Sequence, residues 1–250
     1  MAELRPSSLK ERKEFYEKEF SIKKVRSWFS DNPQFFVVDI GTETHIIKDR
    51  RRLKKLIILE PDISYNELKE KLIQLAPEDV YYDRNKYIDI RKPIKLMDFS
   101  NEIGTKNCLG QELVFDIDPE NISCPFHKKD FHKFCPICIK KSLDFGLAMK
   151  KTLSKNFKRI KLVYSGRGCH VHVKDKKAFG MSIKQRSLLN KKLKEFPIDP
   201  WVSKGHIRLI RLPYSLNSLV SRIALPLNDK EIKNFDAVNE KKIIPAFLRG

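Results

Sequence analysis

The sequence contains no uninterrupted run of about 18 apolar residues, which is the length that a membrane-spanning helix requires. Its first residues, MAELRPSSLKERKEF, lack the apolar stretch of a secretory signal. No long linker rich in Gly, Ser or Pro interrupts the chain, and no internal repeat is visible. We therefore expect a cytoplasmic protein without membrane contact, folded as a single domain over residues 1–250.

Acidic residues are in short supply. Asp and Glu together number 32 against 51 Lys and Arg, which gives a formal net charge of +19. An excess of this size favours a polyanionic partner, such as nucleic acid, nucleotides or an anionic membrane surface. A Lys-rich solvated surface of the kind found in thermophiles would explain the density of charge, but not its bias toward one sign.

Cysteine is sparse and unevenly placed, at Cys108, Cys124, Cys135, Cys138 and Cys169. In a reducing compartment the stretch CPFHKKDFHKFCPIC, residues 124–138, indicates a metal site rather than disulfides. Its three thiolates suit tetrahedral zinc, with His127 or His132 as the fourth ligand, and His127 is preferred because it completes a C-x-x-H pair. Four protein ligands leave no open position, so this zinc is predicted to be structural. The alternative is a group of free buried cysteines, and the two outlying cysteines are expected to bind no metal.

Hydrophobic periodicity and capping residues predict interleaved helices and strands. Helices are expected at residues 9–29, 64–76, 136–155 and 182–196, and a last helical piece begins at Asn228. Strands are expected at 33–41, from 44 onward, and at 80–90, 113–118, 159–173 around a glycine turn, 206–213 and 221–227. This irregular order predicts the α+β class, that is, a mixed α/β fold.

The apolar strand LVFDID, residues 113–118, carries two acidic side chains. Because strand side chains alternate, Asp116 and Asp118 share one face and stand roughly 6–7 Å apart. Two such carboxylates repel each other unless a cation lies between them, and Mg²⁺ or Mn²⁺ suits oxygen ligands. The alternative is an ordinary strand end, at which Asp118 and Pro119 begin a turn.

The stretch YSGRGCHVHV, residues 164–173, has the composition of a phosphate-binding turn. Gly166 and Gly168 allow a sharp turn that exposes backbone N–H groups to an anion. Arg167 between them offers a forked contact to phosphate, and His170 faces the same side of the following strand as His172. The alternative is a hairpin turn with two surface histidines.

The stretch IDPWVSKGHIRLIRLP, residues 198–213, supplies another acid and two arginines. Asp199 is a candidate third carboxylate. Arg208 and Arg211 lie in an otherwise apolar segment and therefore need anionic partners, which are either ligand phosphates or protein carboxylates in a structural ion pair.

Four motifs follow one another along the chain: ELVFDIDPE, CPIC with its upstream ligands, YSGRGCHVHV, and DPWVSKGHIRLIRLPYSL. In this respect the chain resembles the catalytic, or small, subunit of archaeal and eukaryotic DNA primases, over roughly residues 9–227, and it is most similar to the archaeal forms. The resemblance implies the primase catalytic fold, in which helices flank a central mixed sheet. It also implies a small zinc-binding insertion, here at about residues 119–140.

The activity that the resemblance implies is that of a nucleotidyltransferase of the DNA-directed RNA polymerase type. Such an enzyme makes short RNA primers, or DNA primers, on single-stranded DNA for replication. Two Mg²⁺ or Mn²⁺ ions would be held by Asp116, Asp118 and Asp199. The NTP or dNTP would be bound by Ser165, Gly166, Arg167, His170, Arg208, Arg211 and Asn217. The implied partners are the template, the primer, and a primase large subunit or fused domain that carries an iron–sulfur cluster.

Two positions depart from the family pattern. Many eukaryotic members read S-G-R-R-G, whereas this chain has the single Arg167. Asn217 stands where the family usually has His after the LP-x-S-L run, and it can hydrogen-bond a sugar or phosphate but carries no charge. We therefore expect nucleotide affinity or sugar selectivity to differ from that of other members.

Two other functions fit the same motifs. A related polymerase of the same superfamily would extend existing strands in repair or plasmid replication, and dinucleotide formation on an unprimed template separates it from a primase. A zinc-containing nucleic-acid-binding module without catalysis would need no carboxylate triad, and metal-dependent release of pyrophosphate separates it from both enzymes.

Overall fold

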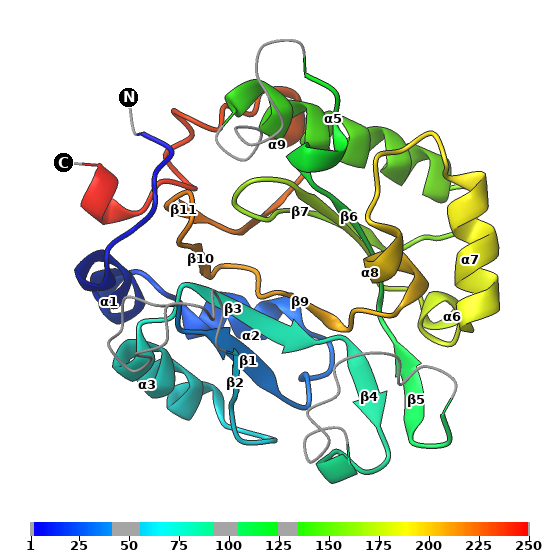
Figure 1. Ribbon diagram of the computed structural model, residues 1–250, viewed down its shortest axis with the longest axis horizontal. Helices are drawn as coiled ribbons and strands as arrows, with labels where there is room; N and C mark the ends of the chain where they lie inside the picture. The colour runs from blue at the N-terminus through cyan, green and yellow to red at the C-terminus, as the bar shows by residue number, and fades with distance from the viewer. Residues whose placement is uncertain (1–2, 42–55, 93–104, 125–134, 250) are drawn as a thin grey trace. The chain divides into compact units, whose positions relative to one another are not determined.

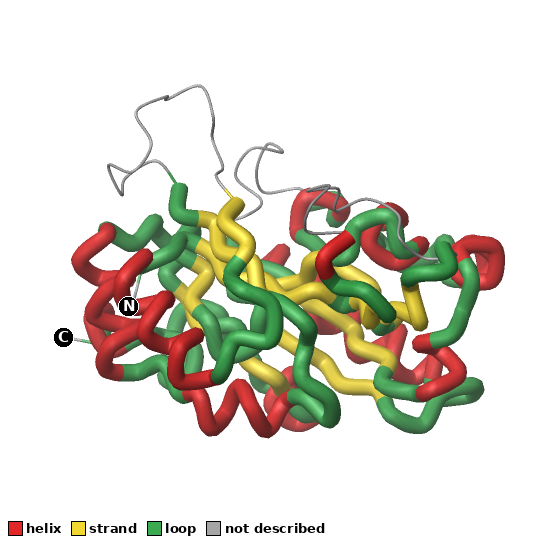
Figure 2. Tube along the Cα trace, turned by 90° about the horizontal axis from the view of Figure 1, so that it is seen from below, coloured by secondary structure: helices red, strands yellow, loops and turns green. Residues whose placement is uncertain are grey.

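A computed structural model describes residues 3–41, 56–92, 105–124 and 135–249. Contacts divide the chain into two compact units. The first consists of Met1–Asp83, Leu209–Leu225 and Val238–Gly250, and the second of Arg84–Arg208 and Pro226–Ala237. Figure 2 shows the helices and strands of both, with the segments that are not described in grey. The organisation as one domain stays a prediction.

The first unit contains a four-stranded sheet in the order β2-β1-β3-β9, and the neighbouring strands are antiparallel. The elements of this unit are α1 (Leu9–Lys18), α2 (Ile22–Trp28), β1 (Phe36–Asp39), β2 (Leu56–Ile58), α3 (Tyr65–Leu75), β3 (Asp79–Asp83), β9 (Leu209–Arg211), β10 (Leu216–Asn217), β11 (Arg222–Ile223) and η3 (Ala246–Leu248). Strand β1 is buried along its whole length, which makes it the centre of this unit's core.

The helix expected at residues 9–29 is instead two helices. Helix α1 ends at Lys18, and Ser21 begins α2 by accepting a hydrogen bond from the backbone N–H of Lys24. A capping serine adopts extended dihedral angles, here φ −107° and ψ 105°, so it interrupts the helical path. The sequence pattern did not reveal this break, because apolar residues recur among charged ones on both sides of it.

The second unit contains a four-stranded sheet in the order β12-β7-β8-β6 and a two-stranded pair, β4 with β5. Its elements are β4 (Asn85–Tyr87), β5 (Cys108–Gln111), β6 (Leu113–Ile117), η1 (Pro119–Asn121), α5 (Pro136–Leu153), β7 (Ile160–Tyr164), β8 (Cys169–Val173), α6 (Lys176–Phe179), α7 (Ile183–Lys192), α8 (Pro200–Lys204), β12 (Leu225–Leu227, which begins one residue before the unit does) and α9 (Asp229–Lys233). Strands and helices alternate irregularly in both units, which confirms the mixed α/β class. Where one central mixed sheet was expected, the structure has two four-stranded sheets, one described in each unit.

Helix α5 packs along the sheet of the second unit (Figure 1). The packing is close because Gly146 has no side chain: a Cβ atom there would lie 2.4 Å from the Sγ atom of Cys169 on β8. Leu143 and Met149 of the same helix are fully buried. This packing fixes the start of α5, which carries two of the candidate zinc ligands.

Several local predictions are confirmed. Ser64, Ser182 and Asn228 each form the expected capping box with the side chain three residues later. Helix α5 lies within the expected range 136–155. The strand expected at 80–90 is broken between β3 and β4, and only residues 209–211 of the segment 206–213 are strand. The strand expected from residue 44 lies outside the described residues. None of the helices in the described part of the chain combines the length and apolar character needed to cross a bilayer.

Candidate functional site

Strands β6 and β8 bring an acid and a histidine together. The two strands are antiparallel, and their register places Asp116 opposite His170 and Val114 opposite His172. Residues opposite each other project from the same face of a sheet. Accordingly, the Nε2 atom of His170 lies 3.4 Å from the Oδ1 atom of Asp116. The shared face predicted for the two histidines is confirmed, with 5.9 Å between their ring centroids.

The glycine turn joins β7 to β8 as a tight hairpin. The backbone N–H of Ser165 donates to the carbonyl of Gly168 at 3.0 Å, and the N–H of Gly168 donates back to the Ser165 hydroxyl oxygen at 3.1 Å. Gly166 has a φ of +102°, which a residue with a side chain rarely adopts. The Ser165 side chain therefore holds the turn closed, and its role toward a nucleotide stays a prediction.

The turn lies against the end of β6. A Cβ atom on Gly168 would lie 2.6 Å from the carbonyl oxygen of Ile117 and 3.2 Å from the Oδ1 atom of Asp118. Arg167 reaches Asp118, with 3.5 Å between Nη2 and Oδ2, and it also pairs with Glu120. The sequence did not single out Glu120, although it lies two residues after Asp118. The turn and the paired aspartates, distant in sequence, are neighbours in space.

Asp199 lies beside Asp116. Its backbone N–H donates to the carbonyl oxygen of Asp116 at 2.8 Å. Its carboxylate accepts the backbone N–H of Trp201, also at 2.8 Å, and so caps helix α8. This helix was not predicted, although Asp followed by Pro, with Gly205 five residues after the Pro, is the usual signal for a short capped helix. The backbones of the three predicted acidic residues thus lie near the same end of β6, and the catalytic roles of these residues stay predictions.

A second polar cluster lies further along the same face of β6 and β8. His172 is fully buried, with its Nδ1 atom 3.1 Å from Glu112 Oε1, and Lys174 Nζ lies 2.6 Å from the same oxygen. Burial lowers the pKa of His172, against the opposing effect of Glu112. Burial alone would raise the pKa of Glu112, but the charges of Lys174 and His172 outweigh it and hold that pKa below its usual range. Sequence reasoning missed this cluster, although alternation along the two strands could have indicated it.

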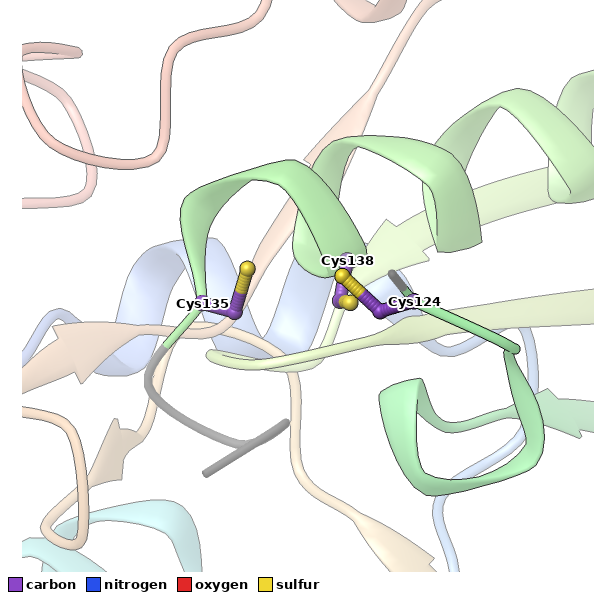
Figure 3. Close-up of side chains that lie close together, drawn as sticks. All are labelled: Cys124, Cys135 and Cys138. Atoms are coloured by element: carbon purple, nitrogen blue, oxygen red, sulfur yellow. The ribbon is translucent and has the colours of Figure 1, made fainter. Parts of the chain in front are cut away.

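Three cysteines form the candidate metal centre (Figure 3). Cys135 and Cys138 belong to the first turn of α5, and Cys124 approaches from the segment after η1. One sulfur from each lies within 4.8 Å of the other two. Burial, followed by the neighbouring Cys124 and Cys135, raises the pKa of Cys138 to about 12. Three thiolates at this spacing require a cation, so the donor set fits a thiophilic metal. The candidate fourth ligands, His127 and His132, lie outside the described residues.

The other predicted nucleotide contacts have partners within the protein. Arg208 is fully buried in the second unit, where it donates to the Tyr87 hydroxyl at 2.5 Å and packs against the Tyr87 ring. Arg211 lies in the first unit and pairs with Asp79. Burial alone would lower the pKa of Arg211, but Asp79 outweighs it and raises that pKa. Asn217 lies in the same unit, buried on β10 opposite Arg222. Contact of these three residues with a nucleotide stays a prediction.

Comparison with known proteins places these features in context. No protein-family model matches the chain. An uncharacterized DNA primase small subunit-like protein of Archaeoglobus fulgidus is 42% identical over 262 residues, which covers 98% of this chain and 92% of the relative. The DNA primase small subunit PriS of Pyrobaculum calidifontis is 30% identical, over 74% of this chain and 70% of that protein. PriS of Thermococcus sibiricus is 26% identical, over 96% and 71%.

One solved structure has a similar fold. It is the polymerase domain of Mycobacterium tuberculosis Ligase D in complex with DNA, with a TM-score of 0.51. The similarity covers 90% of this chain and 81% of that domain, and only 13% of the residues are identical. At this level of identity the likeness concerns the fold alone.

Proposed function

The chain belongs to the DNA primase small-subunit family, and we propose that it is a nucleotidyltransferase that makes short primers on single-stranded DNA. The observation that carries the proposal is the backbone hydrogen bond between Asp199 and Asp116, because it brings together two chain segments whose acidic residues are 83 positions apart in sequence. Arg167 and His170, on the turn and strand beside them, add positive or neutral donors for a phosphate chain. The result is an acidic group next to a phosphate-binding turn.

The donors fit divalent ions such as Mg²⁺ or Mn²⁺. Asp116 and Asp118 have side chains that are 16% and 25% exposed, so an ion could reach them from solvent. Asp116, Asp118 and Asp199 would hold two ions through oxygen atoms, which these metals prefer. When bound, such ions activate the attacking 3′-hydroxyl and stabilise the leaving pyrophosphate.

Arg167 would bind the triphosphate by exchanging partners. It now pairs with Glu120 and Asp118, which are both anions. A phosphate offers the same forked geometry with more negative charge, so it can replace Glu120 as the partner of the guanidinium. His170, whose Nε2 atom faces Asp116, would orient that carboxylate while the nucleotide is bound. Arg208, Arg211 and Asn217 are proposed as further contacts.

The three cysteines would hold a structural Zn²⁺ ion, with His127 or His132 as the fourth ligand. The site lies on the chain between Asp118 and helix α5. A closed set of four ligands would stabilise the segment after η1 without taking part in the reaction.

The proposed partners are DNA and a second subunit or domain. The net charge of +19 supports contact with the phosphates of template and primer, and such contact gives steeply salt-dependent binding. We propose that a large subunit or fused domain with an iron–sulfur cluster assists initiation, and that the protein works in the cytoplasm.

The experiment is primer synthesis on bare single-stranded DNA, with labelled ATP or dATP and Mg²⁺ or Mn²⁺. A primase forms a labelled dinucleotide and then short products. A matched template with an annealed primer tests the second candidate, a polymerase that extends existing strands. Extension without initiation would select that second function, and no incorporation on either template would contradict both.

A further inference from the structure

Helix α8 presents an exposed tryptophan next to the candidate site. The side chain of Trp201 is 62% exposed, whereas the chain's second tryptophan, Trp28, is 4% exposed. His206 lies edge-on to the Trp201 ring, with 5.2 Å between ring centroids and 61° between ring planes. Ile207 beside it is 43% exposed. Together these side chains leave an aromatic face in water that is open to stacking by a ligand.

The exposure of Trp201 does not come from a loose loop, because hydrogen bonds hold its backbone on both sides. The N–H donates to Asp199 Oδ1 at 2.8 Å. The carbonyl oxygen accepts from the N–H of His206 at 3.0 Å and from the N–H of Ile207 at 3.2 Å. The same carboxylate that is proposed to hold metal therefore also fixes the start of the segment that carries the indole.

Buried side chains also hold this segment in place through hydrogen bonds. The guanidinium of Arg84 donates to the carbonyl oxygens of Val202, at 2.9 Å, and of Ile207. The amide of Asn190 donates to the Ser203 hydroxyl at 2.7 Å. The backbone that carries the indole is thus held in place before any ligand arrives, which reduces the entropy lost on binding.

The surroundings favour a nucleobase as the ligand. An aromatic face offers stacking to any base, and a protein with a net charge of +19 attracts the backbone to which bases are attached. Trp201 lies two residues from Asp199, so a strand bound at the carboxylates passes within reach of the ring. A hydrophobic partner protein is the competing occupant, and the charge of the chain favours the nucleic acid.

We propose that Trp201, with His206 beside it, is a stacking platform for a base of the DNA strand that is bound at the carboxylate end of β6. This inference rests on the proposed function, because the strand is the one that the enzyme copies or extends. Stacking tolerates every base, so the platform contributes affinity and positioning rather than sequence preference.

Tryptophan fluorescence tests the proposal without catalysis. A single-stranded oligothymidylate of about 12 nucleotides, long enough for a typical binding site, is titrated without nucleotide or metal. Stacking of a base should quench the emission of Trp201. The change can be assigned to Trp201 because Trp28 is buried. The affinity of the variants, which lack this signal, is measured by the anisotropy of the same oligothymidylate carrying a dye. Trp201→Ala should weaken binding about 5- to 150-fold, while Trp201→Tyr should restore most of the affinity. The slope of log affinity against log salt should not change, since no charge is removed.

Leu188→Ala is the matched control, because Leu188 of α7 is also exposed, at 52%, and lies in the same unit. It should leave DNA affinity unchanged. Equal affinity of Trp201→Ala and wild type, or loss in Trp201→Ala that Trp201→Tyr does not restore, would overturn the platform. Quenching without any pyrophosphate release by the wild type would keep the platform and remove the proposed enzyme. Pyrophosphate release without quenching of Trp201 would keep the proposed enzyme and overturn the platform.

Discussion

The backbone N–H of Asp199 donates a hydrogen bond to the carbonyl oxygen of Asp116 across 2.8 Å. Through this bond, the N-cap of helix α8 is fixed to the end of strand β6 without using either carboxylate. Asp116 also faces His170 from the neighbouring strand. The position of the two residues relative to each other is therefore fixed by backbone atoms.

Because the glycine turn lies close to β6, an alanine substitution at Gly168 should reduce activity, whereas one at Gly180 should not. Gly168→Ala places a Cβ atom 2.6 Å from the Ile117 carbonyl, and backbone cannot move as easily as a flexible side chain. We expect the variant to lose most nucleotide incorporation, because the turn and Asp118 must separate. Gly180→Ala, where nothing lies within 4 Å, is the control and should retain activity. Equal steady-state rates for the two variants would contradict the contact.

The pairing of Arg167 with Glu120 predicts that this acid competes with the nucleotide. Both side chains are partly exposed, so the pair contributes only about 0.2–1 kcal/mol. Glu120→Gln should therefore lower the KM for NTP by about 1.4- to 5-fold and leave kcat unchanged. Arg167→Lys should raise KM, because an ammonium group lacks the forked contact. A KM that rises in Glu120→Gln would show that the acid assists binding instead.

The cysteine cluster predicts a stabilising metal. The purified protein should contain about one zinc ion per chain, and its removal by a chelator should lower the melting temperature. Cys138→Ser should have the same effect, because Cys138 is fully buried within the cluster. Cys108→Ser, outside the cluster, serves as the control for zinc content and melting temperature. If the metal-free protein melts at the temperature of the native one, the site is not structural.

The Glu112, His172 and Lys174 cluster predicts loss of stability in acid. The folded protein lowers the pKa of both His172 and Glu112, so the unfolded chain binds more protons and stability rises with pH. The contribution of His172 is complete above about pH 6.5, and that of Glu112 above about pH 4.3, the values of the unfolded chain. Both decline as the pH falls toward the folded pKa values.

Melting temperatures measured between about pH 8 and pH 4, a range that spans both unfolded values, check this prediction. The wild type should lose stability progressively below about pH 6.5. The double variant Glu112→Gln, His172→Gln should be less stable at neutral pH and should show a shallower decline. An identical pH dependence of wild type and double variant would mean that other groups control the acid transition.

The parts of the fold that could be predicted from the sequence are those that depend on neighbouring residues. The capping boxes at Ser64, Ser182 and Asn228 involve side chains three residues apart, and the shared face of His170 and His172 follows from strand alternation. The turn at Gly166 needs a positive φ, which restricts the choice of residue.

The unpredicted parts depend on partners that are distant in sequence. No local pattern shows that Asp199 reaches Asp116, or that Lys174 lies beside Glu112. Helix α8 was missed because Asp199 was interpreted as a metal ligand and not as a helix cap. Arg211 was correctly expected to need an anionic partner, which is Asp79. For Arg208 the structure shows a hydrogen bond to the neutral hydroxyl of Tyr87.

Pyrophosphate release measures the central claim most directly, with NTP, single-stranded DNA and Mg²⁺ or Mn²⁺ supplied together. The wild type should release pyrophosphate only when metal and template are present. Asp116→Asn and Asp199→Asn should each be slower by on the order of 100-fold or more. Asp199→Asn should keep the wild-type melting temperature, since Asn also caps helices. Asp144→Asn, an exposed residue on α5, should retain the wild-type rate. A wild-type rate in either Asp116→Asn or Asp199→Asn would contradict the account.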